Sequence, residues 1–353
     1  MLSRSVEMSN IFREFLKKIG SGPHTGENLN RQEAAAAMRM MLRQEATPAQ
    51  IGAFLIAHRI KRPTGEELAG MLDAYEELGP QLRLSDPKPM VLGCPYDGRS
   101  RMTPLVPIVT LMLACVGQPA ILHGGDRMPT KYGVPLIDIW QGLGIDWSNL
   151  SLVQVQQAIE TTGLGFVYLP QHFPLAAEII PYRDQIGKRP PIATLELIWS
   201  PVVSDHHLVA GFVHPPTEQM FRDALALRGV TNFTTVKGLE GSCDLPRDRT
   251  AIIGIITNGE FQRLHLNPYN YDLAGKNPPI PETTTQLVEQ IQSVLQGQPS
   301  ELMNSALWNG GFYLWHCGVC PDMETGFDQA EKLLTSGKVK AKLEEVIKIL
   351  SPR

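Results

Sequence analysis

The sequence lacks any long apolar segment. None of its uninterrupted apolar runs reaches the ~18 residues that a membrane-spanning helix needs. The longest apolar stretch, residues 105–116, is interrupted by a proline and a threonine and predicts a buried helix. The first ten residues also lack the apolar stretch of a signal peptide. We therefore expect a cytoplasmic protein with no membrane partner.

The chain also has few cysteines and no excess of positive charge. The five cysteines are odd in number and scattered, which favours free thiols over a disulfide framework. The formal net charge of −4 disfavours an extensive nucleic-acid surface. The chain has 353 residues, of which 43% are hydrophobic, and this is enough to bury a large core in one or two domains.

The first part of the chain has clear helix-start signals. Asn30 with Glu33, and Thr64 with Glu67, have the spacing of a capping box. Pro48 suits the first position of a helix, where its missing N–H costs nothing. Three short helices with brief connections are therefore predicted after Asn30, Thr47 and Thr64.

From about residue 88 the pattern changes to short apolar runs that alternate with helical stretches. The runs are MVLG, PAILHG, GFVYLP, LVAGFV, FTTVKG and AIIGIIT. This alternation predicts an α/β fold with a mostly parallel central sheet. We expect a small all-α domain over residues 1–87, joined by a segment near 175–200, and a larger α/β domain over residues 88–353.

Several motifs occur in an order that resembles one family. They lie at residues 47–79, 122–125 (LHGG), 141–147 (QGLGIDW), 163–190 and 304–314 (NSALWNGGFYL). Together they resemble the anthranilate phosphoribosyltransferases, which have a nucleoside-phosphorylase-like glycosyltransferase fold. The resemblance implies a cleft between two domains that takes phosphoribosyl pyrophosphate, magnesium and an aromatic amine. It also implies a homodimer formed through the helical domain.

The donor loop of the family reads Gly-Thr-Gly-Gly-Asp-Gly, and residues 93–98 read GCPYDG here. Gly93, Asp97 and Gly98 are retained. Pro95 and Tyr96 replace two inner residues, and a proline has no N–H to offer an anion. Strand, glycine turn and helix start still have the layout of a phosphate-binding loop.

The residues after this loop also differ from the family. Thr103 stands where the family has asparagine, and the hydroxyls that would meet phosphate become Leu105 and Val106. Arg99 and Arg101 are new cations, and arginine binds phosphate through two parallel hydrogen bonds. We expect Gly93, Asp97, Gly98, Arg99, Arg101 and Thr103 to form the donor-binding loop.

A second motif, Lys-His-Gly-Asn-Arg in the family, reads LHGGD here. The resemblance assigns His123 and Gly124 to the donor site, and Lys131 downstream is retained as well. Asp126 stands where the family has arginine. A carboxylate at that place would repel pyrophosphate unless a metal lay between them.

The third motif of the family is an acidic pair that positions magnesium. Here one member becomes Cys243 and the other is shortened to Asp244, with Glu240 nearby. Because magnesium prefers hard oxygen ligands, only Asp244 and Glu240 are candidate metal ligands. The resemblance places Arg183 on the acceptor side.

These substitutions leave the function open. The first hypothesis is a phosphoribosyl or glycosyl transferase of altered substrate or reduced activity, acting on phosphoribosyl pyrophosphate or another phosphorylated small molecule. The first alternative is a catalytically inactive member that binds nucleic acid or acts as a regulator. It would need an open basic face, for which the candidates are Arg99, Arg101, Arg127 and Lys131. The second alternative is a nucleoside phosphorylase.

Overall fold

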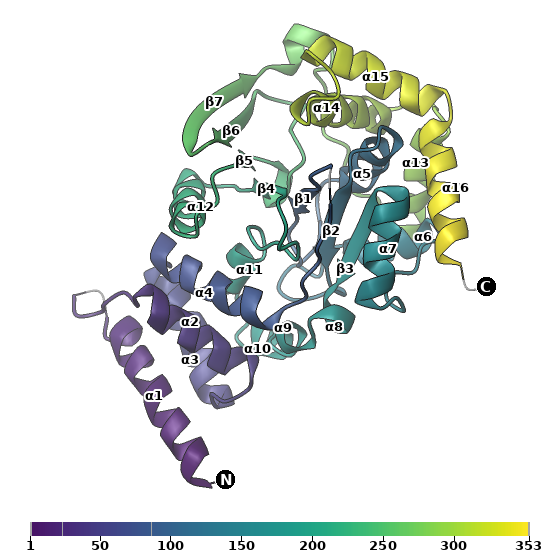
Figure 1. The fold of residues 1–353 in the computed structure, drawn as a ribbon. Coiled ribbons are helices and arrows are strands. Elements are labelled where there is room, and N and C mark those ends of the chain that lie inside the picture. The colour runs from purple at the N-terminus through teal and green to yellow at the C-terminus, as the bar shows by residue number, and fades with distance from the viewer. Residues whose placement is uncertain (1, 23, 86, 352–353) are drawn as a thin grey trace.

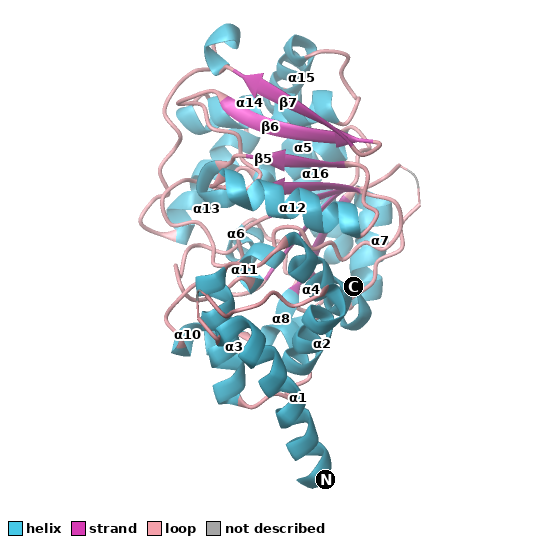
Figure 2. Ribbon diagram, turned by 90° about the vertical axis from the view of Figure 1, so that its left-hand side faces the viewer, coloured by secondary structure: helices cyan, strands magenta, loops and turns pink. Residues whose placement is uncertain are grey.

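The computed structural model describes residues 2–22, 24–85 and 87–351. A helical unit and a larger α/β unit lie against each other, with the N-terminal helices below the sheet (Figures 1 and 2). The helical unit contains α1 (Leu2–Gly20), α2 (Arg31–Leu42), α3 (Pro48–Lys61) and α4 (Gly65–Leu78). The small helical domain and the larger α/β domain of the prediction are thereby confirmed.

The predicted helix starts are confirmed in detail. Asn30, Thr47 and Thr64 each accept a hydrogen bond from the backbone N–H three residues on, and each forms a complete capping box. Helix α1 was not among the predicted helices. Its apolar residues Phe12 and Phe15 lie at helical spacing and are buried.

The sheet has seven strands in the order β3-β2-β1-β4-β5-β6-β7. The strands are β1 (Met90–Gly93), β2 (Ala120–Gly124), β3 (Leu164–Tyr168), β4 (His207–Gly211), β5 (Phe233–Val236), β6 (Ala251–Thr257) and β7 (Glu260–Leu266). Strands β1 to β5 pair in parallel, and β6 and β7 add an antiparallel edge. All six predicted strands are present; β7 was not predicted.

Helices cover both faces of the sheet. Helix α12 lies on the face toward the helical unit, and α5, α7 and α16 lie on the other (Figure 1). The helices of this unit are α5 (Val106–Cys115), α6 (Leu136–Gly142), α7 (Leu152–Thr162), α8 (Leu169–His172), α9 (Pro174–Ala177), α10 (Ile180–Gln185), α11 (Ile192–Leu195), α12 (Pro215–Leu227), α13 (Thr284–Leu295), α14 (Glu301–His316), α15 (Met323–Thr335) and α16 (Lys338–Leu350). Two short 3-10 turns cover Leu239–Gly241 and Pro268–Tyr271.

Further predictions concern the cysteines and the apolar stretch. The five cysteines are free, as predicted. The described helices include none that is both long and apolar enough to cross a membrane. The stretch around residues 105–116 forms the buried helix α5.

The strand order places the candidate site. The chain runs from β1 outward through β2 and β3, then returns to the other side of β1 as β4. In such sheets ligands bind outside the carboxyl ends of the strands, where the order reverses. The donor loop follows β1, His123 lies at the carboxyl end of β2, and the acidic segment follows β5.

Candidate functional site

Two retained glycines shape the donor loop. A Cβ on Gly93 would lie 2.1 Å from the carbonyl oxygen of Leu197, so the backbone approach excludes any side chain. Gly98 has a φ of 76°, and a Cβ there would lie 2.5 Å from the backbone of Gly133. Close backbone contacts therefore restrict both positions to glycine.

The backbone donors in the second half of this loop, from Gly98 to Leu105, are used within the protein. Every N–H from Gly98 to Leu105 donates a hydrogen bond to another protein atom, Pro104 having none. Arg99 pairs with Val134 through both its N–H and its carbonyl. The N–H and hydroxyl of Thr103 donate to the carbonyls of Pro278 and Pro279.

The centre of the loop holds a carboxylate that belongs to the protein itself. The N–H groups of Arg101 and Met102 donate to Oε1 of Glu240, both at 3.0 Å, and the N–H of Ser100 donates to Oε2 at 3.3 Å. Nε of Arg99 adds a fourth bond at 3.2 Å. Successive N–H groups that converge on one anion form the usual anion-binding arrangement of a loop. Here the anion is Glu240, whose side chain is 2% exposed.

Charge holds this carboxylate in its ionised form. Burial alone raises the pKa of Glu240, but Arg99, the N–H groups of the loop and Lys131 lower it to about 2. Glu240 has a φ of 54°, a left-handed backbone conformation that is uncommon outside glycine. The surrounding contacts stabilise this conformation and direct the side chain into the loop.

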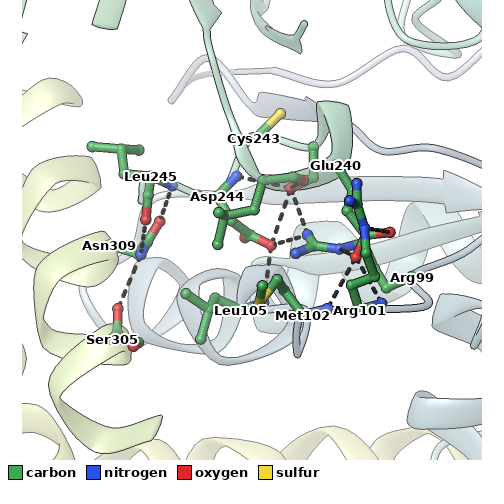
Figure 3. Close-up of polar contacts among 12 residues, drawn as sticks. Arg99, Arg101, Met102, Leu105, Glu240, Cys243, Asp244, Leu245, Ser305 and Asn309 are labelled. Carbon is green, nitrogen blue, oxygen red and sulfur yellow. Dashed lines mark hydrogen bonds and ion pairs between the residues drawn. The ribbon is translucent and has the colours of Figure 1, made fainter. Parts of the chain in front are cut away.

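A second carboxylate lies at the start of α5. Oδ2 of Asp244 accepts hydrogen bonds from Nη1 of Arg99 at 2.6 Å and from the N–H of Leu105 at 3.3 Å. Figure 3 shows Asp244 and Glu240 directed at the guanidinium of Arg99. A phosphate at a helix N-terminus would occupy this position, because negative charge is favourable there.

Side chains of helix α14 hold the backbone of the acidic segment, residues 240–246, by hydrogen bonds. Oδ1 of Asn309 accepts from the N–H of Leu245 at 2.7 Å (Figure 3), and the hydroxyl of Tyr313 donates to the carbonyl of Cys243 at 2.6 Å. The indole N–H of Trp308 donates to the carbonyl of Pro246 at 3.1 Å. These positioning residues belong to the motif at 304–314, but none of them is among the site residues predicted from the sequence. The available signal was Asn309, a polar residue inside the otherwise apolar helix α14.

Three other predicted donor residues lie around this cluster. Asp97 is fully buried, and its carboxylate lies 3.3 Å from Nε of Arg189 and 3.9 Å from Nζ of Lys131. Lys131 is also 3.8 Å from the Glu240 carboxylate, so it is shared between two acids. Arg101 extends into solvent, with its side chain 74% exposed.

His123 is buried in an aromatic cluster at the end of β2, next to Gly124. Its Nδ1 lies 2.5 Å from the hydroxyl of Tyr96, and its ring packs edge-on against Trp199. Burial lowers the pKa of His123 to about 3, so the ring is neutral. Tyr96 replaces a family glycine and contacts the ring that the resemblance assigned to the donor.

Arg183, predicted on the acceptor side, is buried and ion-paired. Its Nη1 lies 2.6 Å from Oε1 of Glu196. Burial raises the pKa of Glu196 to about 7, despite the neighbouring Arg183. Nε and Nη2 of Arg183 have no hydrogen-bond partner among the described residues.

The residues present do not fit a magnesium ion. Both predicted ligands, Asp244 and Glu240, are turned toward the cation Arg99. The thiol of Cys243 donates to the carbonyls of Gly93 and Val209. Among the described residues, no three His, Cys, Asp or Glu side chains gather as metal ligands. Arg99 supplies the positive charge that a metal would otherwise bring.

Comparison with known proteins decides the family. A model for the helical bundle domain of a glycosyl transferase family matches residues 13–79, and the model for the a/b domain matches residues 106–340. The chain belongs to this glycosyl transferase family, with the anthranilate phosphoribosyltransferases. The anthranilate phosphoribosyltransferase of Chromobacterium violaceum is 28% identical over 327 residues, which cover 91% of this chain and 94% of that protein.

Solved structures of the family share the fold. The anthranilate phosphoribosyltransferase from Thermus thermophilus has a TM-score of 0.77 at 22% identity and covers 96% of this chain and 99% of its own. The Saccharomyces cerevisiae enzyme in complex with phosphoribosyl pyrophosphate and magnesium has a TM-score of 0.81 at 16% identity, with 98% and 99% covered. The fold is thus retained while the residues of the donor loop differ.

Proposed function

We propose that this chain is a ligand-binding member of its family that does not carry out magnesium-dependent phosphoribosyl transfer. The observation that supports this is the position of Glu240. Its carboxylate accepts the N–H groups of Ser100, Arg101 and Met102, which is how a loop of this kind would hold a phosphate. A donor pyrophosphate would have to displace a buried anion from its own counter-ion, Arg99.

The contacts behind the acidic segment oppose that displacement. Tyr313 and Asn309 hold the backbone on either side of Asp244. Removing one partner from a buried ion pair costs about 3–5 kcal/mol, since the other charge is left uncompensated. The same argument disfavours a nucleoside phosphorylase, which would need inorganic phosphate at this loop.

The basic face suggested for nucleic acid is not supported by these contacts. Arg99 is buried, Arg127 pairs with Asp138, and Lys131 lies between Asp97 and Glu240. Of the four cations, Arg101 is the most exposed, and even its Nε lies 3.9 Å from Oε2 of Glu240. The homodimer through α1–α4 and the cytoplasmic location stay predictions.

The test compares the native chain with the variant Glu240→Gly. Glycine adopts the left-handed backbone without cost and removes the carboxylate, which leaves the N–H groups of Ser100, Arg101 and Met102 without their partner. Titration of inorganic phosphate should give no heat with the native chain and measurable binding with the variant. Equal phosphate binding by both proteins would show that Glu240 does not occupy an anion site.

A further inference from the structure

Two histidines meet at the edge of the sheet opposite the donor loop. His207 is the first residue of β4, and His316 is the last residue of α14. Strands β1, β4 and β5 run in parallel, so the amino end of β4 lies at the other edge of the sheet from the carboxyl end of β1, where the donor loop begins. The histidine pair is therefore separate from the donor loop.

The two rings and one hydroxyl form a triangle of nitrogen and oxygen atoms. Nε2 of His207 lies 3.2 Å from Nε2 of His316, and the hydroxyl oxygen of Thr234, on β5, lies 2.9 Å from the first nitrogen and 2.8 Å from the second. Ligand atoms bound to one metal ion at about 2.0–2.1 Å lie about 2.8–3.4 Å apart, from octahedral to tetrahedral geometry. The sides of the triangle fall in this range, so one ion can contact all three atoms with little movement of the side chains.

Packing holds these side chains in place. The ring of His316 stacks on Phe312, with 5.4 Å between the ring centroids and 7° between the ring planes. The rings of His207 and His316 lie edge-on at 72°, and Thr234 is fully buried. Burial also lowers the pKa of His207 to about 4 and that of His316 to about 3, so both rings are neutral near pH 7. A neutral imidazole in a fixed orientation is a suitable ligand for zinc, nickel or copper.

A cavity of about 450 Å³ gives access to the pair, and both histidines line it. The described part of the chain brings no third His, Cys, Asp or Glu side chain to them. The thiol of the neighbouring Cys317 donates instead to the carbonyl of Leu314 in its own helix. The donor set is therefore two nitrogens and one hydroxyl oxygen, and the remaining coordination positions are open to water from the cavity.

We infer that this chain binds one zinc ion through Nε2 of His207, Nε2 of His316 and the hydroxyl oxygen of Thr234, with water facing the cavity. Zinc suits this set because its tetrahedral geometry takes three protein atoms and one water, whereas magnesium prefers oxygen ligands. The ion joins the end of α14 to strands β4 and β5. Helix α14 also carries Asn309 and Tyr313, which hold the acidic segment, so the ion stabilises the helix that supports the donor loop.

Isothermal titration of zinc chloride into the untagged chain, with its thiols kept reduced by a phosphine, tests the inference. The variants are His207→Gln and His316→Gln, and the control is His265→Gln, which removes an exposed histidine of β7. The native chain and the control should bind one zinc ion at micromolar concentration. Each of the other two variants should bind at least about tenfold more weakly, since even the loss of a group that orients a metal ligand costs about 10–100-fold. Zinc should raise the melting temperature of the native chain and the control only.

Equal zinc affinity in the native chain and in both ligand variants would overturn the inference, and so would the lack of binding up to millimolar zinc. Zinc binding that both histidine variants keep and that Cys317→Ser loses would place the ion on thiols and equally overturn it. Melts without zinc show whether each variant folds. If one histidine variant fails to fold, the other decides the question alone, because the site requires both rings.

Discussion

Replacing Glu240 by glutamine should destabilise the fold much more than an ordinary surface change. The amide keeps the shape of the side chain but removes the negative charge that faces Arg99 and the loop N–H groups. The pKa of Glu240 falls from its ordinary value of 4.5 to about 2, which corresponds to about 3 kcal/mol of stabilisation at neutral pH. The general cost of breaking a buried ion pair, about 3–5 kcal/mol, agrees with this value.

The stabilisation by Glu240 should decrease at low pH. Because the pKa is lower in the folded state, the contribution is complete above pH 4.5 and is lost as the pH falls toward 2. Urea unfolding at pH 7 and pH 3 should show the difference between native chain and Glu240→Gln shrinking to roughly half at pH 3.

The matched control is Glu301→Gln. Glu301 also pairs with a buried arginine, Arg247, at 3.0 Å, but its side chain is 63% exposed. Its loss should cost less than ~1 kcal/mol. If Glu240→Gln were as stable as this control, or if its deficit were the same at pH 7 and pH 3, the carboxylate would not be the stabilising ligand of the loop.

Two further predictions concern the same region. Because burial lowers the pKa of His123 from 6.5 to about 3, its unfolded form takes up a proton first, and stability falls as the pH drops below 6.5. The stability of the native chain relative to His123→Gln should therefore fall by about 2–3 kcal/mol between pH 6.5 and 4.5, and a constant difference in urea unfolding would refute this. Gly93→Ala should destabilise by at least about 1–3 kcal/mol, because its Cβ would lie 2.1 Å from the carbonyl oxygen of Leu197. The control Gly52→Ala in α3, where a Cβ meets nothing closer than 3.8 Å, should be neutral or slightly stabilising, and equal thermal shifts for the two would contradict the account.

The elements with local signals were predictable from the sequence. The capping boxes at Asn30 and Thr64 fix where helices begin, and the β-branched apolar run AIIGIIT forms a mostly buried strand, as predicted. Strand β7 (EFQRLHL) has no apolar run, since it lies at the edge and is half exposed. Its apolar and polar residues alternate only weakly, because Glu260 and Arg263 interrupt the pattern.

The state of the donor loop was not predictable from the sequence. The loss of phosphate-binding residues is visible in GCPYDG, but the replacement of phosphate by a carboxylate is not. That replacement depends on Glu240 meeting Arg101 and Met102 from a segment about 140 residues away. It also depends on a left-handed backbone at Glu240, which no residue-type pattern indicates. Arg99 and Asp244 were singled out as candidates, but their pairing with each other was not foreseen.

The most direct test of the account is isothermal titration of phosphoribosyl pyrophosphate into the native chain, with and without magnesium. Because Glu240 and Asp244 already fill the anion positions of the loop and face Arg99, we predict no magnesium-dependent binding up to millimolar ligand. Micromolar binding that requires magnesium would contradict the account. It would mean that the acidic segment leaves the loop and that the donor site of the family is intact.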